Sequence, residues 1–283
     1  MKNESANKLK LSQERQRSEM LQGLSNKLAK YLSPQVYESI FSGERDVTLT
    51  SSRKKLTICF TDIVGFTDAS DQMESEDLTQ LLNHYLSEMT QIALEYGATV
   101  DKYIGDAIMI FFGDPKSRGV EQDAVLCIEM AMAMQKRVCE LQQEWRSSGF
   151  SKPFFIRVGI HTGYCTVGNF GAENRLDYTI VGSAVNLASR IESCAEPGSV
   201  CISEDTYLLV RDKFAAVPTQ KFKPKGLAAA VQLYRVLDAG EEHAGVDVIE
   251  PGFELKIRQQ DLTPEAKAKL KQQLQDVLQD LDD

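Results

Sequence analysis

Histidine, tryptophan and patterned cysteine are scarce in this sequence. Its 283 residues include three histidines, one tryptophan and six cysteines. With only His84, His161 and His243 available, we expect no histidine metal site. The cysteines form no CxxC pair and have no regular spacing. This spacing indicates that the cysteines are small buried hydrophobic residues in a reducing compartment and not parts of a disulfide framework.

Long apolar runs and an excess of basic residues are also lacking. No stretch approaches the ~18 uninterrupted apolar residues of a membrane span, and the first residues lead into charged sequence without a signal-peptide core. The net charge of -9 disfavours non-specific binding to nucleic acid or to an anionic membrane. We therefore expect a cytoplasmic protein without membrane insertion or nucleic-acid binding, in which a few placed cations hold any anionic substrate.

Hydrophobic patterning predicts one domain of ordinary size with segments added at both ends. Hydrophobic residues at 42% and charged residues at 26% are typical of globular proteins. Apolar residues at three-and-four spacing predict a helix over 5–32, whose two heptads allow a short coiled coil without establishing one. Ser33-Pro34 predicts the start of a second helix over 35–41.

The central part alternates strand and helix patterns. We predict a strand over 56–60, a helix over 75–96, two strands over 98–103 and 107–112, a helix over 120–145 and a strand over 153–159. This βαββαβ order is the ferredoxin-like plan of an α+β fold. Additional strands are predicted at 164–169, 177–181, 199–202 and 231–237, with a helix over 184–194. Beyond residue 238 we expect a hairpin around Pro251-Gly252 and an amphipathic helix from Thr263, of unknown role.

Two aspartates stand beside apolar predicted strands. Asp62 follows the strand over 56–60, and Asp106 lies in the tight turn before the strand over 107–112. A carboxylate in such surroundings loses hydration unless a cation or several donors replace the water. Hard oxygen ligands without a neighbouring Cys/His cluster favour Mg²⁺ or Mn²⁺ over zinc.

A divalent cation held by two carboxylates suits phosphoryl or nucleotidyl transfer. Gly65, soon after Asp62, would let backbone amides approach a phosphate chain before the next helix. Taken alone, this pattern leaves open that both aspartates are ordinary turn and cap residues.

Four further segments are more specific, and together they resemble the class III nucleotidyl cyclase catalytic domain. They are Phe60–Thr67, Lys102–Asp106, Arg157–Gly163 and Asp177–Arg190. The resemblance extends from Lys54 to about Leu237, and it implies a catalytic domain over 54–238 preceded by a helical signalling or linker segment over 1–53.

The resemblance implies a role for each matching position. Asp62, Asp106 and the Ile63 backbone would hold two Mg²⁺ or Mn²⁺ ions on the triphosphate of ATP, and the backbone of Ile63, Gly65, Phe66 and Thr67 would contact phosphate. The other implied roles are base recognition by Lys102 and Thr179, ribose orientation by Asn186, transition-state stabilisation by Arg190, and a grip on the terminal phosphates by Lys223, with Lys225 as second candidate.

Base choice follows from hydrogen-bond chemistry. Adenine needs a donor for its ring nitrogen and an acceptor for its exocyclic amine, and guanine presents the reverse pattern. Lys102 is a donor only and the Thr179 hydroxyl can accept, which favours an adenylyl cyclase. Threonine in place of the aspartate of many members resembles a subgroup, class IIIb, that often responds to bicarbonate. We therefore hypothesise bicarbonate stimulation.

The resemblance also implies a homodimer with two shared sites, because the metal aspartates of one subunit would face the remaining site residues of the other. The segment 171–175 is either an arm that reaches this partner or a plain hairpin loop. The rival functions are a guanylyl cyclase and a silent nucleotide-binding regulatory module. The N-terminal helices resemble the signalling elements that precede many such cyclase domains. The chain is therefore either the output end of a longer receptor with an upstream sensor domain or a free-standing enzyme.

Overall fold

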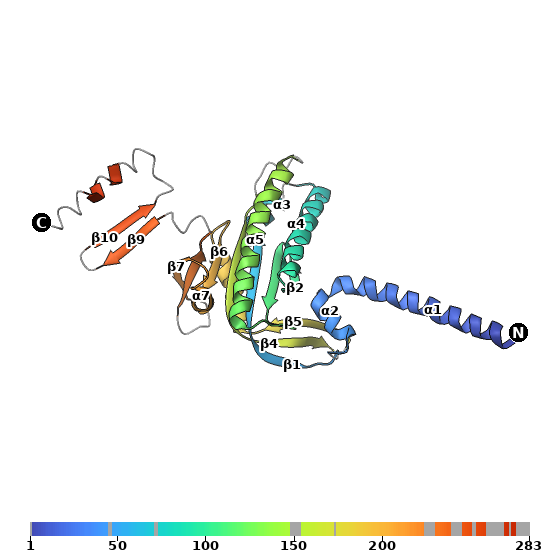
Figure 1. Cartoon of the computed structure of the whole chain (residues 1–283). Helices are drawn as coiled ribbons and strands as arrows, with labels where there is room; N and C mark the ends of the chain where they lie inside the picture. Colours follow the sequence, from blue (N-terminus) through green and yellow to red (C-terminus); the bar gives the residue numbers. More distant parts are fainter. Residues whose placement is uncertain are drawn as a thin grey trace.

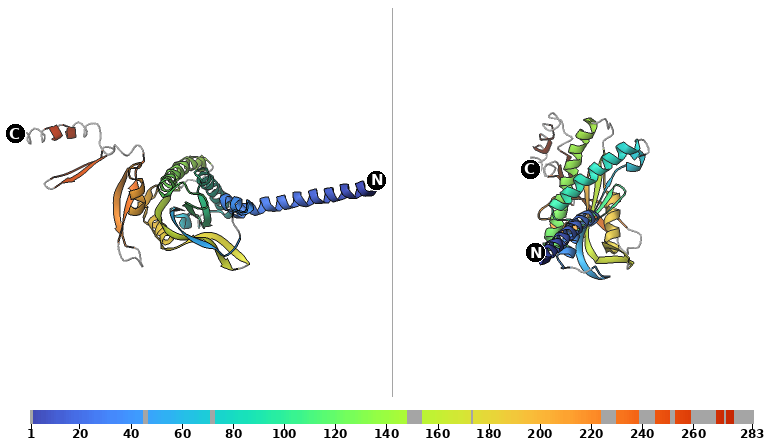
Figure 2. Two further views of the ribbon diagram at one scale, coloured as in Figure 1. Left: turned by 60° about the horizontal axis from the view of Figure 1, so that its bottom comes forward. Right: turned by 90° about the vertical axis from the view of Figure 1, so that its right-hand side faces the viewer.

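The computed structural model describes residues 2–44, 47–70, 73–147, 154–172, 174–223, 230–238, 245–250, 253–258, 269–271 and 273–275. The two N-terminal helices are present as predicted. Helix α1 (Lys2–Leu28) continues into a 3-10 turn (Ala29–Tyr31), and α2 (Pro34–Phe41) follows. Ser33 caps α2 by accepting a hydrogen bond from the Val36 amide, with proline at the first helical position. Helix α1 projects away from the rest of the chain (Figures 1 and 2).

An eight-stranded sheet forms the centre of the molecule. Its strands are β1 (Ser51–Ile63), β2 (Thr99–Ile104), β3 (Ala107–Phe112), β4 (Ile156–Ala172), β5 (Arg175–Val181), β6 (Val200–Ser203), β7 (Ala216–Phe222) and β8 (Val231–Val236). The order is β2-β3-β1-β4-β6-β8-β7, and β5 pairs with β4. The first four strands pair antiparallel in the order β2-β3-β1-β4. The predicted ferredoxin-like core is therefore confirmed, with the predicted extra strands beyond it.

Two layers cover the sheet. One face packs against α4 (Ser75–Glu95) and α5 (Val120–Ser147), whose buried stripes include Tyr85, Met89, Ile128 and Met134. On the other face α6 (Ser183–Cys194) contacts β1 and β4. Strand β1 supplies both layers, because alternate side chains point to opposite faces: Ile58 and Phe60 pack with Ala184 and Ala188, whereas Cys59 packs with the helical layer. This alternation also places Asp62 on the face that α6 covers.

One predicted feature was wrong. The sequence indicated two strands, over 153–159 and 164–169, separated by a turn rich in glycine, but β4 runs unbroken from Ile156 to Ala172. The glycines in this stretch allow close packing against a helix and do not form a turn. A Cβ at Gly159 would meet the backbone nitrogen of Glu192 at 2.0 Å, and one at Gly163 would meet the Ala184 side chain at 2.9 Å. They let α6 lie directly on the strand.

Three elements were missed by the pattern analysis. They are α3 (Phe66–Ser70), α7 (Glu204–Val210) and β7, all of them short. The C-terminal hairpin is present as β9 (Gly245–Glu250) and β10 (Phe253–Arg258), away from the main sheet on the side of β7 (Figure 1). Its Pro-Gly turn and most of the expected last helix lie outside the described residues, although 269–271 and 273–275 are helical.

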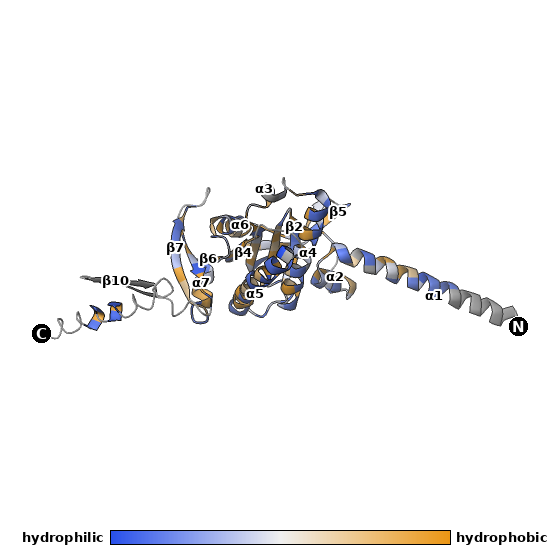
Figure 3. Cartoon of the chain, turned by 90° about the horizontal axis from the view of Figure 1, so that it is seen from above, coloured by the Kyte–Doolittle hydropathy of each residue, from blue (hydrophilic) through white to orange (hydrophobic). Residues whose placement is uncertain are grey.

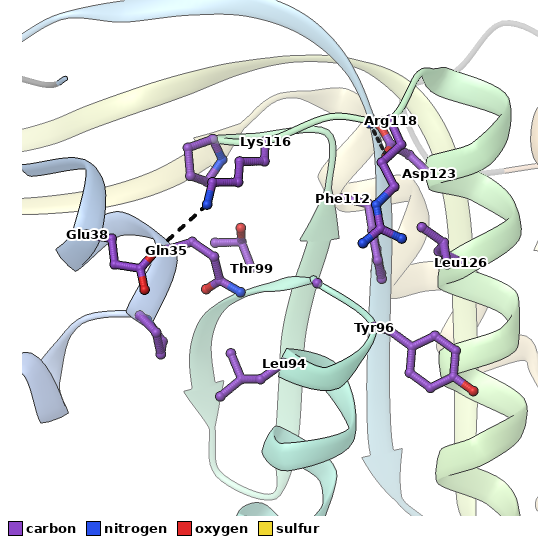
Figure 4. Close-up of a pocket in the computed structure, with 13 residues that line it drawn as sticks. Gln35, Glu38, Leu94, Tyr96, Thr99, Phe112, Lys116, Arg118, Asp123 and Leu126 are labelled. Carbon is purple, nitrogen blue, oxygen red and sulfur yellow. Dashed lines mark hydrogen bonds and ion pairs between the residues drawn. The ribbon is translucent and has the colours of Figure 1, made fainter. Parts of the chain in front are cut away.

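Helix α2 is attached to the start of β2. The Gln35 side-chain amide donates to the Ala98 carbonyl oxygen at 2.7 Å, and Val36 and Ser39 are buried. A cavity of about 340 Å³ lies between α2 and the core, with Glu38, Tyr96, Phe112 and Arg118 among its lining residues (Figure 4). No predicted site residue lines it. The ribbon of α1 shows hydrophobic positions between hydrophilic ones (Figure 3). Met20 and Leu24 of this helix are exposed.

Candidate active site

Asp62 and Asp106 come together although 44 positions separate them in the numbering. Strands β1 and β3 pair with Thr61 opposite Ile108, so the β2–β3 turn lies beside the end of β1. The amide of Ile63 donates to Asp106 Oδ2 at 3.0 Å. Burial raises the pKa of Asp106 to about 6, and the neighbouring carboxylate of Asp62 acts in the same direction. The predicted metal ligands therefore form one half-buried pair of mutually repelling carboxylates.

This pair fits a metal that brings most of its own ligands. Among the described residues, no group of three or more histidine, cysteine, aspartate or glutamate side chains could hold a metal ion. Mg²⁺ and Mn²⁺ are bound in many phosphate-handling sites by one or two carboxylates, with waters and phosphate oxygens completing the coordination. The Ile63 carbonyl is the adjacent backbone oxygen. The donor set therefore suits a metal–nucleotide complex better than a protein-only metal site.

Arg157 and Glu192 complete this corner, and their roles were not predicted. Arg157 lies opposite Asp62 in the β1–β4 ladder, and its Nη2 lies 2.9 Å from Asp62 Oδ2. Its Nε forms an ion pair with Glu192 Oε1 at 2.5 Å, and Glu192 is 7% exposed. Arg157 thus connects the predicted metal ligand to α6. One sequence feature could have indicated these roles: Glu192 lies on an otherwise apolar face of α6.

The chain after Asp62 makes a sharp turn into α3. The Val64 amide donates to the Phe155 carbonyl oxygen at 2.8 Å, and Gly65 has φ +70°, a conformation that favours glycine. Phe66 and Thr67 open the short α3 helix. The predicted phosphate-contacting residues are therefore contiguous with Asp62 in space as well as in sequence, and their binding role stays a prediction.

Lys102 and Thr179 belong to different strands and meet through Asp101. Thr179 Oγ1 donates to Asp101 Oδ2 at 2.6 Å, and the Ile180 amide contacts the same oxygen at 3.4 Å. Lys102 Nζ lies 3.2 Å from Asp101 Oδ1. Sequence reasoning had paired the lysine and the threonine but had not singled out Asp101. The two predicted base-reading side chains thus share one buried carboxylate.

Asn186 and Arg190 lie one helical turn apart on α6, with Asn186 exposed and Arg190 half-buried. Within the part of the chain that the structure describes, no hydrogen bond or ion pair joins either side chain to Asp62 or Asp106. Lys223 is exposed and directly follows β7, at the opposite edge of the sheet from β2. Lys225 lies outside the described residues. Among the described residues, neither the α6 pair nor Lys223 forms a hydrogen bond or ion pair with the two carboxylates.

His161 lies within β4 and has structural contacts. Its Nδ1 lies 2.8 Å from Ser203 Oγ, and the residue is 6% exposed. Burial lowers its pKa to about 4. The imidazole is therefore neutral at physiological pH and has no contact with the aspartate pair among the described residues.

The chain belongs to the family described as the adenylate and guanylate cyclase catalytic domain, whose model matches residues 49–237. It is 33% identical to an adenylate cyclase of Anabaena cylindrica over 216 residues, which are 75% of this chain and 41% of that protein. An adenylate cyclase of Rhizobium meliloti is 30% identical over 187 residues, which are 65% of this chain and 28% of that protein. The chain thus spans less than half the length of these two relatives.

Solved structures of both cyclase types resemble the chain. The adenylyl cyclase CyaB from P. aeruginosa has 52% sequence identity and a TM-score of 0.66, covering 68% of this chain and 97% of that one. The guanylyl cyclase Cya2 has 32% identity and a TM-score of 0.64, covering 69% of this chain and 98% of that one. The expected family and fold are confirmed. Because relatives of both types match, the choice between adenine and guanine depends on the site itself. Among the described residues, no helix is long and apolar enough to cross a membrane.

Proposed function

We propose that the chain is an adenylyl cyclase that converts ATP to 3′,5′-cyclic AMP and pyrophosphate. The observation that carries this proposal is the pairing of Lys102 and Thr179 around Asp101, which places a donor and a potential acceptor together for the edge of adenine. In the reaction the ribose 3′-oxygen forms a bond to the α-phosphorus, and the bond from that phosphorus to the bridging α–β oxygen breaks. Pyrophosphate leaves with those electrons. The 3′ proton passes to Asp62, to water or to a substrate phosphate.

Asp62, Asp106 and the Ile63 carbonyl would hold two Mg²⁺ or Mn²⁺ ions. Bound there, the ions would neutralise phosphate charge and lower the pKa of the attacking hydroxyl. The support for this assignment is the convergence of two carboxylates, one with its pKa raised to about 6, at the end of β1. Arg157 contacts only Oδ2 of Asp62, and the other carboxylate oxygen would remain for a cation.

The remaining residues would position the nucleotide. The backbone of Ile63, Gly65, Phe66 and Thr67 would contact phosphate, and Lys223 would grip the terminal phosphates. Asn186 would orient the ribose, and Arg190, always charged, would stabilise charge that builds up on the phosphorus. Their one-turn spacing on α6 presents both to one ligand.

We also propose a homodimer with two shared sites. The absence of any described contact between the α6 pair and the aspartates supports this reading, since one chain then holds two separate half-sites. The β4–β5 hairpin, with Ala172 opposite Arg175 at its tip, would be the arm toward the second copy.

Residues 54–238 would form the catalytic domain and 1–53 the segment that transmits a signal from an upstream sensor. The attachment of α2 to Ala98, at the start of the strand that carries Lys102, supports this. Threonine at position 179, where many members of the family have aspartate, supports bicarbonate as an activator. A cytoplasmic location suits an ATP substrate and six cysteines that are all free thiols.

Product analysis tests the function directly. Purified protein is incubated with ATP or GTP, each with Mg²⁺ and with Mn²⁺, and the nucleotides are separated. Cyclic AMP from ATP, with little cyclic GMP from GTP, is the expected outcome. Preferential formation of cyclic GMP from GTP would make the chain a guanylyl cyclase. The absence of any cyclic nucleotide, from a preparation that binds nucleotide, would support the silent regulatory module.

A further inference from the structure

Asp101 is an almost fully buried carboxylate beside the predicted base-reading residues. Its side chain is 1% exposed, whereas that of Lys102 is 41% exposed. The β2–β3 ladder is irregular between Val100 and Lys102, so that Asp101 lies at a bulge. Bulges re-aim a side chain, and consecutive strand residues otherwise point to opposite faces. Here the irregularity lets Asp101 and its neighbour Lys102 approach within 3.2 Å.

Two hydrogen-bond donors and one cation converge on this carboxylate. They are the Thr179 hydroxyl at 2.6 Å, the Ile180 amide at 3.4 Å and the Lys102 ammonium at 3.2 Å. Burial raises the pKa of Asp101, and these donors oppose that shift by favouring the ionised form. An ionised carboxylate is an acceptor only. The Thr179 proton therefore points at Asp101, and the hydroxyl cannot donate it elsewhere without losing this bond.

The direction of that one proton bears on base recognition. A free threonine hydroxyl can either accept from the exocyclic amine of adenine or donate to the exocyclic oxygen of guanine. When its proton is committed to Asp101, only its lone pairs remain for the ligand. The Lys102 ammonium has three N–H groups, so at least two stay available for a ring nitrogen while one faces Asp101.

We propose that Asp101 is a positioning residue that sets base specificity: it fixes Thr179 as a hydrogen-bond acceptor beside Lys102, which is a donor in any orientation, so that the site takes adenine and rejects guanine. This inference rests on the proposed cyclase function and adds to it a residue that never touches the base. Such sites are selective because the wrong base leaves a buried donor or acceptor of the site unpaired, which costs free energy. Rejection of guanine therefore depends on the hydrogen-bond direction that Asp101 imposes on Thr179.

The test compares Asp101→Asn with wild type. The amide has nearly the same shape but can donate to Thr179 Oγ1, which frees the hydroxyl proton for guanine. We expect the ratio of kcat/KM for ATP to that for GTP to fall about tenfold or more, mainly through KM, because base contacts are made before and during the reaction. Asp212→Asn removes an exposed aspartate in the turn after α7, and it should leave the ratio unchanged.

Three further variants test whether Asp101 acts through Thr179. Thr179→Val removes the hydroxyl, and adding Asp101→Asn to it should change the ratio little further, because the two effects are coupled. Asp101→Glu keeps a carboxylate and should keep the preference for ATP even where total activity falls. It also serves as the informative variant if Asp101→Asn folds poorly.

An unchanged ratio in Asp101→Asn, or independent effects that multiply in the double variant, would overturn the proposal. The cyclase function would then stand on the wild-type measurement. If the wild type itself preferred GTP, the proposed function would fail first, whatever the variants did.

Discussion

Arg157 Nη2 lies 2.9 Å from Asp62 Oδ2, while Nε of the same guanidinium contacts Glu192 on α6. One guanidinium therefore bridges two carboxylates, one in the predicted metal site and one almost fully buried. The same helix presents Asn186 and Arg190. In a homodimer with shared sites, this contact would connect the metal half of one site to the α6 half of the other.

Replacing Arg157 with glutamine should destabilise the fold. Glu192 would keep its burial but lose its ion-pair partner, and we expect the free energy of unfolding to fall by about 2 kcal/mol, discounted for the partial exposure of Arg157. Urea denaturation at pH 7 measures this. Lys116→Gln, which removes an exposed contact with Glu38, should change it by less than about 0.5 kcal/mol. An equal loss of unfolding free energy in both variants would contradict a stabilising role for the Arg157–Glu192 ion pair.

Asp106→Asn tests the carboxylate pair. Above pH 6 the ionised Asp106 is disfavoured by burial and by Asp62, so the variant should be as stable as wild type or slightly more stable when EDTA removes divalent ions. Adding Mn²⁺ should raise Tm in wild type, since a ligand that binds only the folded state stabilises it. The variant should lose most of that rise together with activity. An undiminished Mn²⁺ effect would place the metal elsewhere.

Subunit mixing tests the shared sites. Asp106→Ala and Arg190→Ala should each be inactive in homodimers. When the two chains are co-expressed with different tags and the heterodimer is isolated, one of its two sites holds both intact halves. We expect roughly half of the wild-type activity per dimer to return. If a properly exchanged heterodimer remained inactive, both halves of a site would have to belong to one chain.

Bicarbonate should stimulate the enzyme if the threonine-bearing subgroup is the right one. Initial rates are compared with and without added bicarbonate, at fixed pH and with chloride salt keeping the ionic strength constant. A higher rate with bicarbonate is expected. No difference under these conditions would remove the hypothesis, which rests on Thr179 alone, and would leave the cyclase function untouched.

The buried His161 should make the fold sensitive to acid. Burial lowers its pKa from 6.5 to about 4. Between these two pH values, the folded state therefore binds fewer protons than the unfolded state. Stability is fully present above pH 6.5 and falls with the pH toward 4, with a loss of about 2 kcal/mol expected between pH 8 and pH 5 from this group. His161→Gln should flatten that part of the pH profile of unfolding. The exposed His84→Gln should leave it as in wild type, and a profile equally steep in both variants would rule out His161 as the cause.

Local sequence determined most of the elements and the identity of the chemistry-bearing residues. Periodic apolar positions predicted α4, α5 and β1–β3 because burial imposes a period of 3.6 on a helix and of 2 on a strand. The tight turn at Gly105-Asp106 predicted where the second carboxylate would lie. Short elements such as α3 and β7 were missed because few residues give too weak a periodic signal.

Tertiary structure decided the partnerships. Thr179 and Asp101 are 78 positions apart, and Arg157 and Asp62 are 95 apart, so no local pattern links either pair. The continuity of β4 was likewise invisible in the sequence, since glycines that suggest a turn serve here to admit α6. Sequence alone determined which carboxylates, cations and hydroxyls the chain carries. Only the fold decided which carboxylate accepts which proton, because strand pairing and burial bring distant residues within hydrogen-bond distance and exclude the water that would otherwise compete.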